Sequence, residues 1–153
     1  MAQVTLLAPV SGTVTALADV DDPVFSAELV GPGLAIAPDQ DGGGTVLAPV
    51  AGQVVKLHPH AFVVQSGTGA AVLVHLGIDT VQLGGEGFAL HVAEGDQVEA
   101  GQLLVTWDPA VVEQGGRSAV CPVVVLEAEP GSLARHHEPG AHVTAGQPFL
   151  DWS

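Results

Sequence analysis

The sequence contains one eleven-residue pattern twice, and this duplication constrains the fold more than any other feature. Residues Leu7–Leu17 and Leu47–Leu57 share the pattern L-A-P-V-x-G-x-V-x-x-L, 40 positions apart. A second pair, Gly95–Gln102 and Gly140–Gln147, lies 45 positions apart, and each member leads into an apolar run that ends in a tryptophan. Proline and glycine between short apolar runs are typical of tight corners between strands. The two pairs predict a duplicated β-unit with internal pseudo-symmetry. The glycines also fit turn positions of positive φ, an explanation that carries no function.

The rest of the chain also favours strands. Its 20 glycines and 11 prolines interrupt short, valine-rich runs, which is the composition of many strands joined by turns. One helical turn is predicted over Pro109–Gln114, ended by Gly115-Gly116, and another short turn is expected within residues 22–30. We therefore expect an all-β fold, a small sandwich or barrel, with residues 1–153 forming a single domain.

The charge balance excludes several classes of function. The chain carries 17 acidic and 3 basic residues, a net charge of −14. Three cations are too few to neutralise a nucleic-acid backbone, and an anionic membrane surface would repel the chain. A partner should therefore be neutral or basic. The single cysteine, Cys121, excludes an intrachain disulfide and a cysteine-based metal cluster.

The sequence also predicts where the protein works. No apolar run reaches the roughly 20 residues of a membrane span. The strand pattern begins at Gln3, which leaves no room for a signal peptide. We expect a cytoplasmic protein without direct membrane insertion.

Two histidines near the middle of the chain are the candidates for chemistry. His60 and His75 flank two apolar runs, 61–65 and 70–74, which the loop Ser66–Gly69 separates. If the two middle residues of that loop form the turn, His60 lies directly opposite His75; if the last two form it, the histidines are diagonal neighbours. Facing imidazoles fit a shared hydrogen bond, a metal site, or a nucleophile with a helper.

The surroundings of His75 favour the nucleophile. His75 ends an apolar strand, and Gly77 leaves room for a large group to approach the imidazole. A histidine nitrogen can accept a phosphoryl group and pass it on, while a second histidine donates a hydrogen bond to the phosphoryl oxygens. The remaining histidines of the second half are expected at the surface: His91, His136, His137 and His142.

At these residues the sequence resembles the glucose-type enzyme IIA family of the bacterial phosphoenolpyruvate-dependent sugar phosphotransferase system. The densest block of the resemblance is Val74–Leu83, followed by Gly85–Phe88. Further blocks occur in the same order as in the family, and together they cover nearly the whole chain: Ala8–Gly12, Pro23–Phe25, Val30–Ile36, His60–Phe62 and Cys121–Val124.

The resemblance implies a β-sandwich of duplicated hybrid-motif type and a phosphocarrier function. It implies that His75 receives a phosphoryl group from the histidine-containing phosphocarrier HPr and that His60 stabilises the phosphohistidine. The group then passes to a cysteine on the IIB domain of a glucose or N-acetylglucosamine permease. No metal cofactor is needed for this transfer, and a stand-alone monomer is expected.

The resemblance also implies an apolar docking surface around the two histidines. Its candidate residues, chosen by position, are Phe25, Leu29, Val30, Phe62 and Ile78, flanked by Asp22 and Asp79 as acids for basic partner residues. Which sugar permease is served, and whether regulatory targets exist as for enteric relatives, stays open.

The sequence departs from the family pattern just before the first histidine. Many relatives carry a threonine two positions before it, which relays a hydrogen bond, whereas this chain has His58 there. The run from Lys56 to His60 is also shorter than in the enteric pattern. His58 is expected either to replace the threonine as a hydrogen-bond donor or to cap a loop.

Two other functions were weighed against the phosphocarrier. A zinc hydrolase of the related lysostaphin-type fold would use His60, His75 and Asp79 as ligands, but its motifs occur in the reverse order. A weak zinc ion bridging His60 and His75 remains an alternative, because relatives bind zinc there. A biotinyl or lipoyl carrier needs a lysine at a hairpin tip, whereas the only lysine, Lys56, lies within an apolar run.

Overall fold

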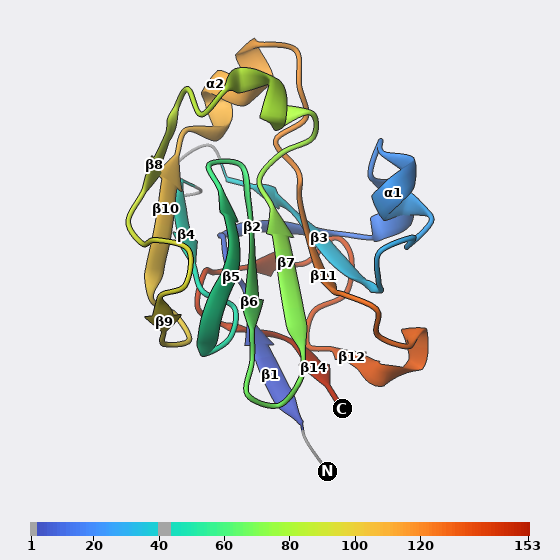
Figure 1. Ribbon diagram of the computed structural model, residues 1–153. Coiled ribbons are helices and arrows are strands. Elements are labelled where there is room, and N and C mark those ends of the chain that lie inside the picture. Colours follow the sequence, from blue (N-terminus) through green and yellow to red (C-terminus); the bar gives the residue numbers. More distant parts are fainter. Residues whose placement is uncertain (1–2, 40–43) are drawn as a thin grey trace.

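Three antiparallel sheets make up the computed structural model, which describes residues 3–39 and 44–153 (Figure 1). The strands are β1 (Val4–Leu7), β2 (Gly12–Thr15), β3 (Gly33–Pro38), β4 (Thr45–Leu47), β5 (Gly52–His58), β6 (Ala61–Gln65), β7 (Ala71–His75), β8 (Phe88–Leu90), β9 (Gln97–Val98), β10 (Leu103–Trp107), β11 (Cys121–Val125), β12 (Leu133–Arg135), β13 (His142–Val143) and β14 (Pro148–Trp152). The sheets are open, so the predicted all-β fold is confirmed as a sandwich and not as a closed barrel.

Helical structure is confined to short turns, as predicted. The two α-helices are α1 (Pro23–Ser26) and α2 (Pro109–Gln114), and three 3-10 turns are η1 (Leu17–Asp19), η2 (Thr80–Leu83) and η3 (Pro130–Ser132). Both α-helices begin in the same way: the carboxylate of Asp22 accepts from Val24 N, that of Asp108 accepts from Ala110 N, and a proline follows each aspartate. No helix among the described residues is long and apolar enough to cross a membrane.

The order of the strands carries the predicted duplication. The large sheet runs β13-β2-β3-β11-β7-β6-β5-β9, and the small sheets run β1-β14-β12 and β4-β10-β8. Counted inward from the two ends of the large sheet, β13 is equivalent to β9, β2 to β5, β3 to β6 and β11 to β7. A pseudo-twofold axis therefore passes between β11 and β7.

The repeated segments bond to each other reciprocally. Leu7 N donates to Pro49 O and Leu47 N donates to Pro9 O, both at 2.8 Å. The second repeat follows the same rule, because Gly101 N donates to Ala48 O while Gly146 N donates to the equivalent Ala8 O. The two copies of each sequence pattern are therefore structurally equivalent halves of one sandwich.

Two apolar clusters fill this architecture. The larger lies inside the sandwich and includes Leu6, Val64, Val74, Leu104 and Phe149. The smaller packs α1 and η1 against the outer face of the large sheet, and it contains Leu17, Val20, Phe25, Ala35, Ile78 and Val124. The smaller cluster fixes α1 beside the end of β7, where His75 lies.

Candidate functional site

His75 is the last residue of β7, and the carbonyl group of Gly77 anchors its ring. The Nδ1 atom of His75 lies 2.5 Å from Gly77 O. A carbonyl oxygen only accepts hydrogen bonds, so Nδ1 of the neutral ring carries the proton and donates it. The lone pair of neutral His75 is therefore on Nε2.

Gly77 has a different role from the one expected. Its φ is +78°, and an added Cβ atom would lie 2.7 Å from Thr80 Cγ2 and 2.9 Å from Ser118 O. The position is crowded, so Gly77 does not leave room for a group that approaches His75. It turns the chain so that its carbonyl meets the ring, and Thr80 secures the same turn by donating to Leu76 O at 2.7 Å.

The loop between β6 and β7 is one residue longer than predicted. Ser66 N donates to Ala70 O, which leaves the three residues Gly67–Gly69 in the loop. The hydroxyl groups of Ser66 and Thr68 lie 2.9 Å apart, and Gly69 has a φ of +103°. Three-residue loops of this kind use a glycine to rejoin the second strand. Both registers considered from the sequence are therefore wrong.

With the observed register, His75 pairs with Ala61 and not with His60. Strict alternation would then place His60 on the opposite face, but His60 is outside the strand. It occupies the tight turn between β5 and β6, in which His58 pairs with Ala61. From this turn its ring reaches that of His75, with ring centroids 5.3 Å apart and ring planes at 68°. The rings of His60 and His75 are therefore close together, as predicted, but the turn and not the strand register brings them together.

Both rings are placed so that their neutral forms are favoured. Burial is the main factor that lowers the pKa of His75; the Gly77 carbonyl and the carboxylates of Asp22 and Asp79 oppose it. Burial also lowers the pKa of His60, helped by repulsion from His75 and His58. At neutral pH, His75 thus presents an unprotonated Nε2 atom, and His60 retains one N–H donor.

A further histidine joins the pair. The ring of His58 stacks on that of His60, with centroids 5.6 Å apart and planes at 23°. The His58 ring makes no hydrogen bond among the described residues, and its contact with the pair is this stack. Sequence patterns did not predict this stack, because it depends on the two-residue turn.

Some of the proposed docking residues are buried, and the others are accessible. Phe62 is 1% exposed and belongs to the larger cluster, so it offers a partner almost no surface. Phe25 and Ile78 are each 5% exposed and belong to the smaller cluster, so they too offer a partner little surface. Phe25 instead forms a wall of the site, its ring centroid 5.3 Å from that of His75.

The accessible residues around the site are few. Leu29 is 72% exposed, Val30 is half-buried, Asp79 is exposed, and Asp22 caps α1. The sequence analysis missed three exposed valines on the short helical elements around His75: Val24 on α1, Val81 on η2 and Val111 on α2. An apolar residue in so short a helix carries no periodic signal that separates an exposed position from a buried one.

The zinc ligands and the cysteine considered from the sequence do not form a reactive site among the described residues. No three His, Cys, Asp or Glu side chains of the described residues are grouped to hold a metal ion, so the ligand set His60, His75 and Asp79 of a zinc hydrolase is not formed. Burial raises the pKa of Cys121 to about 12, which leaves it a protonated, unreactive thiol.

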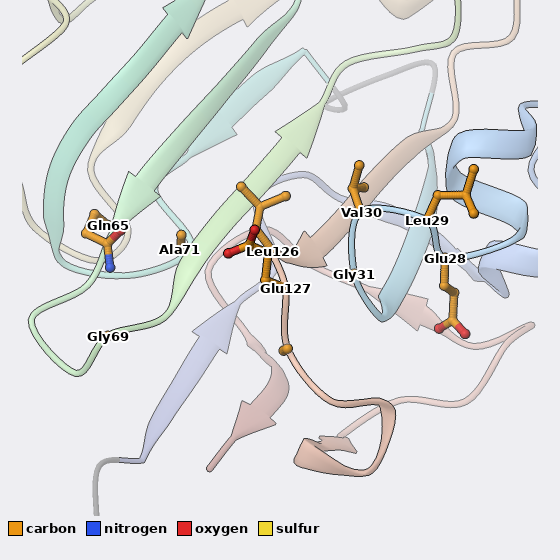
Figure 2. A pocket seen from close by; sticks show the side chains of 10 residues that line it. Glu28, Leu29, Val30, Gly31, Gln65, Gly69, Ala71, Leu126 and Glu127 are labelled. Carbon is orange, nitrogen blue, oxygen red and sulfur yellow. The ribbon is translucent and has the colours of Figure 1, made fainter.

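A hollow of the surface lies away from the histidines. Its volume is about 650 Å³, and it is lined by residues 28–31 and 126–128 and by the β6–β7 loop region (Figure 2). Ala71, which borders it, is at the opposite end of β7 from His75, roughly 13 Å along the strand. Two glutamates, Glu28 and Glu127, lie on its wall, and no histidine does.

Comparison with known proteins identifies the family of this chain. Residues 4–130 match the family described as phosphoenolpyruvate-dependent sugar phosphotransferase system, EIIA 1. The glucose-specific EIIA component of Halalkalibacterium halodurans is 43% identical over 126 residues, which cover 81% of this chain and 71% of the relative. That of Oceanobacillus iheyensis is 38% identical over 129 residues, 83% of this chain and 76% of the relative.

A longer protein and a solved structure extend the comparison. The glucosamine-specific EIICBA component of Bacillus subtilis is 43% identical over 122 residues, which are 78% of this chain and 19% of that protein. The structure of glucose permease IIA from Mycoplasma capricolum superposes with a TM-score of 0.85 at 33% identity, covering 97% of this chain and 95% of the other. The chain therefore belongs to the EIIA 1 family of the phosphoenolpyruvate-dependent sugar phosphotransferase system.

Proposed function

We propose that His75 is the residue on which this EIIA component carries a phosphoryl group from HPr to a IIB domain, and that His60 assists the transfer. Membership of the family makes the chain a phosphotransferase component of the sugar phosphotransferase system. The assignment to His75 rests on one observation above all: the Nδ1 contact with Gly77 O, which leaves Nε2 as the free nucleophilic nitrogen.

The transfer is an in-line exchange between two imidazoles. The lone pair on His75 Nε2 attacks the phosphorus atom of phospho-HPr, and a new N–P bond forms as the N–P bond to the HPr histidine breaks. The electron pair of the broken bond stays on the HPr imidazole. Nδ1 of His75 keeps its proton, and the Gly77 carbonyl stabilises the positive charge that develops on the ring.

The second transfer has the same form. A cysteine thiolate of the IIB domain attacks the phosphorus atom, the N–P bond to His75 breaks, and its electron pair returns to Nε2. We assign to His60 the donation of an N–H hydrogen bond to a phosphoryl oxygen, because its ring meets that of His75 at 68° and 5.3 Å. Positioning and electrostatics suffice for these steps, and we propose that they need no metal ion.

Partners would dock over the exposed apolar residues beside His75. Leu29, Val24 and Val81 provide the apolar contact, with Val30 partly accessible beside them. Asp22 and Asp79 supply negative charge for basic residues of HPr and IIB, in agreement with the net charge of −14. The relatives named above are glucose-specific and glucosamine-specific, so we propose a permease for one of these sugars, or for N-acetylglucosamine, and action in the cytoplasm as one domain.

The proposal is tested by intact mass after incubation with phosphoenolpyruvate, enzyme I and HPr. One acid-labile phosphoryl adduct is expected on the wild type and none on His75→Ala. His91→Ala serves as the matched control, because His91 is an exposed histidine whose ring bonds only to Thr106 among the described residues. A wild type without an adduct, or an adduct retained by His75→Ala, would contradict the assignment.

A further inference from the structure

The ring of His60 packs against two other rings. Its neighbours are His58, stacked at 23° with centroids 5.6 Å apart, and His75, at 68° and 5.3 Å. His75, by contrast, has a hydrogen bond from Nδ1 to Gly77 O. No hydrogen bond to the His60 imidazole occurs in the part of the chain that the structure describes. The orientation of the helper histidine therefore depends on ring packing.

The backbone around His60 is well fixed, so its side-chain torsions are the freedom that remains. His58 ends β5 and pairs with Ala61, and the intervening turn consists of Pro59 and His60. Proline restricts φ at its own position. The carbonyl of His60 accepts from Leu76 N at 2.7 Å, which ties the turn to the end of β7.

The turn also packs against the glycine-rich segment after η2. An added Cβ atom on Gly85 would lie only 3.3 Å from Pro59 Cγ, so the proline ring packs close to the backbone of Gly85. The turn thus has contacts on both sides, and a ring that leaves its stacked position would do so by rotating about χ1 and χ2. The stack with His58 opposes that rotation.

We propose that His58 is a positioning residue of the transfer site, whose stacked ring keeps the edge of His60 directed toward the phosphoryl group on His75. This inference rests on the proposed function and deepens it by adding a third histidine. His58 does not touch the reacting atoms. It acts through His60, by restricting that ring to one orientation in the free and the phosphorylated protein.

Two variants distinguish the effect of the stacked ring from other effects of replacing His58. His58→Phe keeps an aromatic ring of similar shape that can stack, whereas His58→Ala removes it. With His58→Ala we expect transfer to IIB to slow by about tenfold, the size expected when one aromatic contact that orients a helper is lost. With His58→Phe we expect recovery to within about twofold of the wild type, because stacking needs no hydrogen bond. Acceptance from phospho-HPr should change less than transfer in both.

The orientation of His60 is measured separately by NMR. In the wild type and His58→Phe, nuclear Overhauser contacts between the rings at positions 60 and 75 are expected in the unphosphorylated protein. They should weaken in His58→Ala, while the thermal midpoint stays near that of the exposed control His91→Ala. A merely structural role of His58 would lower the midpoint and leave the ratio of transfer to acceptance unchanged.

The outcomes are distinguishable. If the wild type carries no adduct on His75, the proposed function fails and the role of His58 fails with it. If the wild type is phosphorylated but His58→Ala transfers to IIB as fast as the wild type, only the role of His58 is contradicted. If His58→Phe is as slow as His58→Ala, ring stacking is not the means of positioning, and the inference is likewise overturned.

Discussion

The Nδ1 atom of His75 donates to the carbonyl oxygen of Gly77 across 2.5 Å, and this contact selects the nucleophilic atom of the site. Neutral histidine has two tautomers, and a carbonyl acceptor at Nδ1 permits one of them. The contact also orients the ring at the end of β7 by a main-chain group, so the conformation of the backbone at Gly77 sets the orientation. Gly77 is thus as important to the site as the histidine it holds.

The phosphoryl group is accordingly expected on Nε2 of His75. Nitrogen-15 and phosphorus-31 NMR of the phosphorylated protein should show phosphorus coupled to Nε2, with Nδ1 still protonated. Phosphorus on Nδ1 would require the contact with Gly77 O to break, and observing it would contradict the assignment of the nucleophile.

His60→Gln should separate the two half-reactions. The variant retains an amide donor near His75 but loses the ring that packs at 5.3 Å. We expect it to accept a phosphoryl group from phospho-HPr and to transfer it to IIB at least about tenfold more slowly than the wild type, because a misplaced donor is costly. The check is a pair of single-turnover time courses, one for each step. Equal transfer rates for variant and wild type would refute the helper role of His60.

Acceptance should fall at acidic pH with a midpoint below the ordinary histidine pKa of 6.5. The pKa of His75 is lowered, chiefly by burial, so the ring stays neutral until the pH is below that value. The unfolded chain binds a proton at higher pH than the folded chain. The free energy of unfolding should therefore decrease as the pH falls from 6.5 through the lowered pKa.

Both parts of this pH dependence can be measured. NMR titration of the His75 ring gives its pKa directly, and urea unfolding at several pH values gives the stability. His75→Gln should lose part of the stability change. A pKa of His75 above 6.5 would contradict the prediction.

The duplication predicts matched effects at equivalent positions. The side chain of Gln102 accepts from Glu99 N at 3.0 Å, and that of Gln147 accepts from Thr144 N at 2.8 Å. Each alanine variant should reduce the free energy of unfolding by about 0.5–1.5 kcal/mol, the usual range for one hydrogen bond. Urea denaturation of both variants checks this. A loss confined to one of them would show that the two hairpins are not energetically equivalent.

The sequence predicted the fold well because repeats and turn residues are local signals. The helix Pro109–Gln114 is predicted with its observed bounds, since the proline at its start and the two glycines after it mark both ends. The equivalence of Leu7–Leu17 and Leu47–Leu57 followed from identical spacing and reappears as reciprocal hydrogen bonds.

The details of the site were harder to predict, because they depend on loop length and on main-chain atoms. One additional residue in the loop Gly67–Gly69 moved Ala61 opposite His75, and the two-residue turn at His60 restored the proximity of the rings. The role of the Gly77 carbonyl has no side-chain signal. Phe62 is buried because its side chain packs into the larger cluster, which its position beside His60 in the sequence does not reveal.

Gly77→Ala should reduce both stability and phosphoryl acceptance. The φ of Gly77 is +78°, and the new Cβ atom would lie 2.7 Å from Thr80 Cγ2 and 2.9 Å from Ser118 O. Backbone strain costs about 1–3 kcal/mol, and the overpacked neighbours add about 1–3 kcal/mol. Relief of these contacts moves the carbonyl oxygen away from His75 Nδ1, so the ring loses its orientation and acceptance slows.

Gly69→Ala is the matched control for this change. Gly69 has a φ of +103°, but no heavy atom lies within 4 Å of an added Cβ atom, so the variant reports strain without overpacking. It should lose stability by about 1–3 kcal/mol and accept phosphoryl groups at the wild-type rate. Urea unfolding and the acceptance time course are measured on both variants. If Gly77→Ala accepts as fast as Gly69→Ala, the carbonyl of Gly77 does not position the nucleophile, and the orientation of His75 must come from its packing against Phe25.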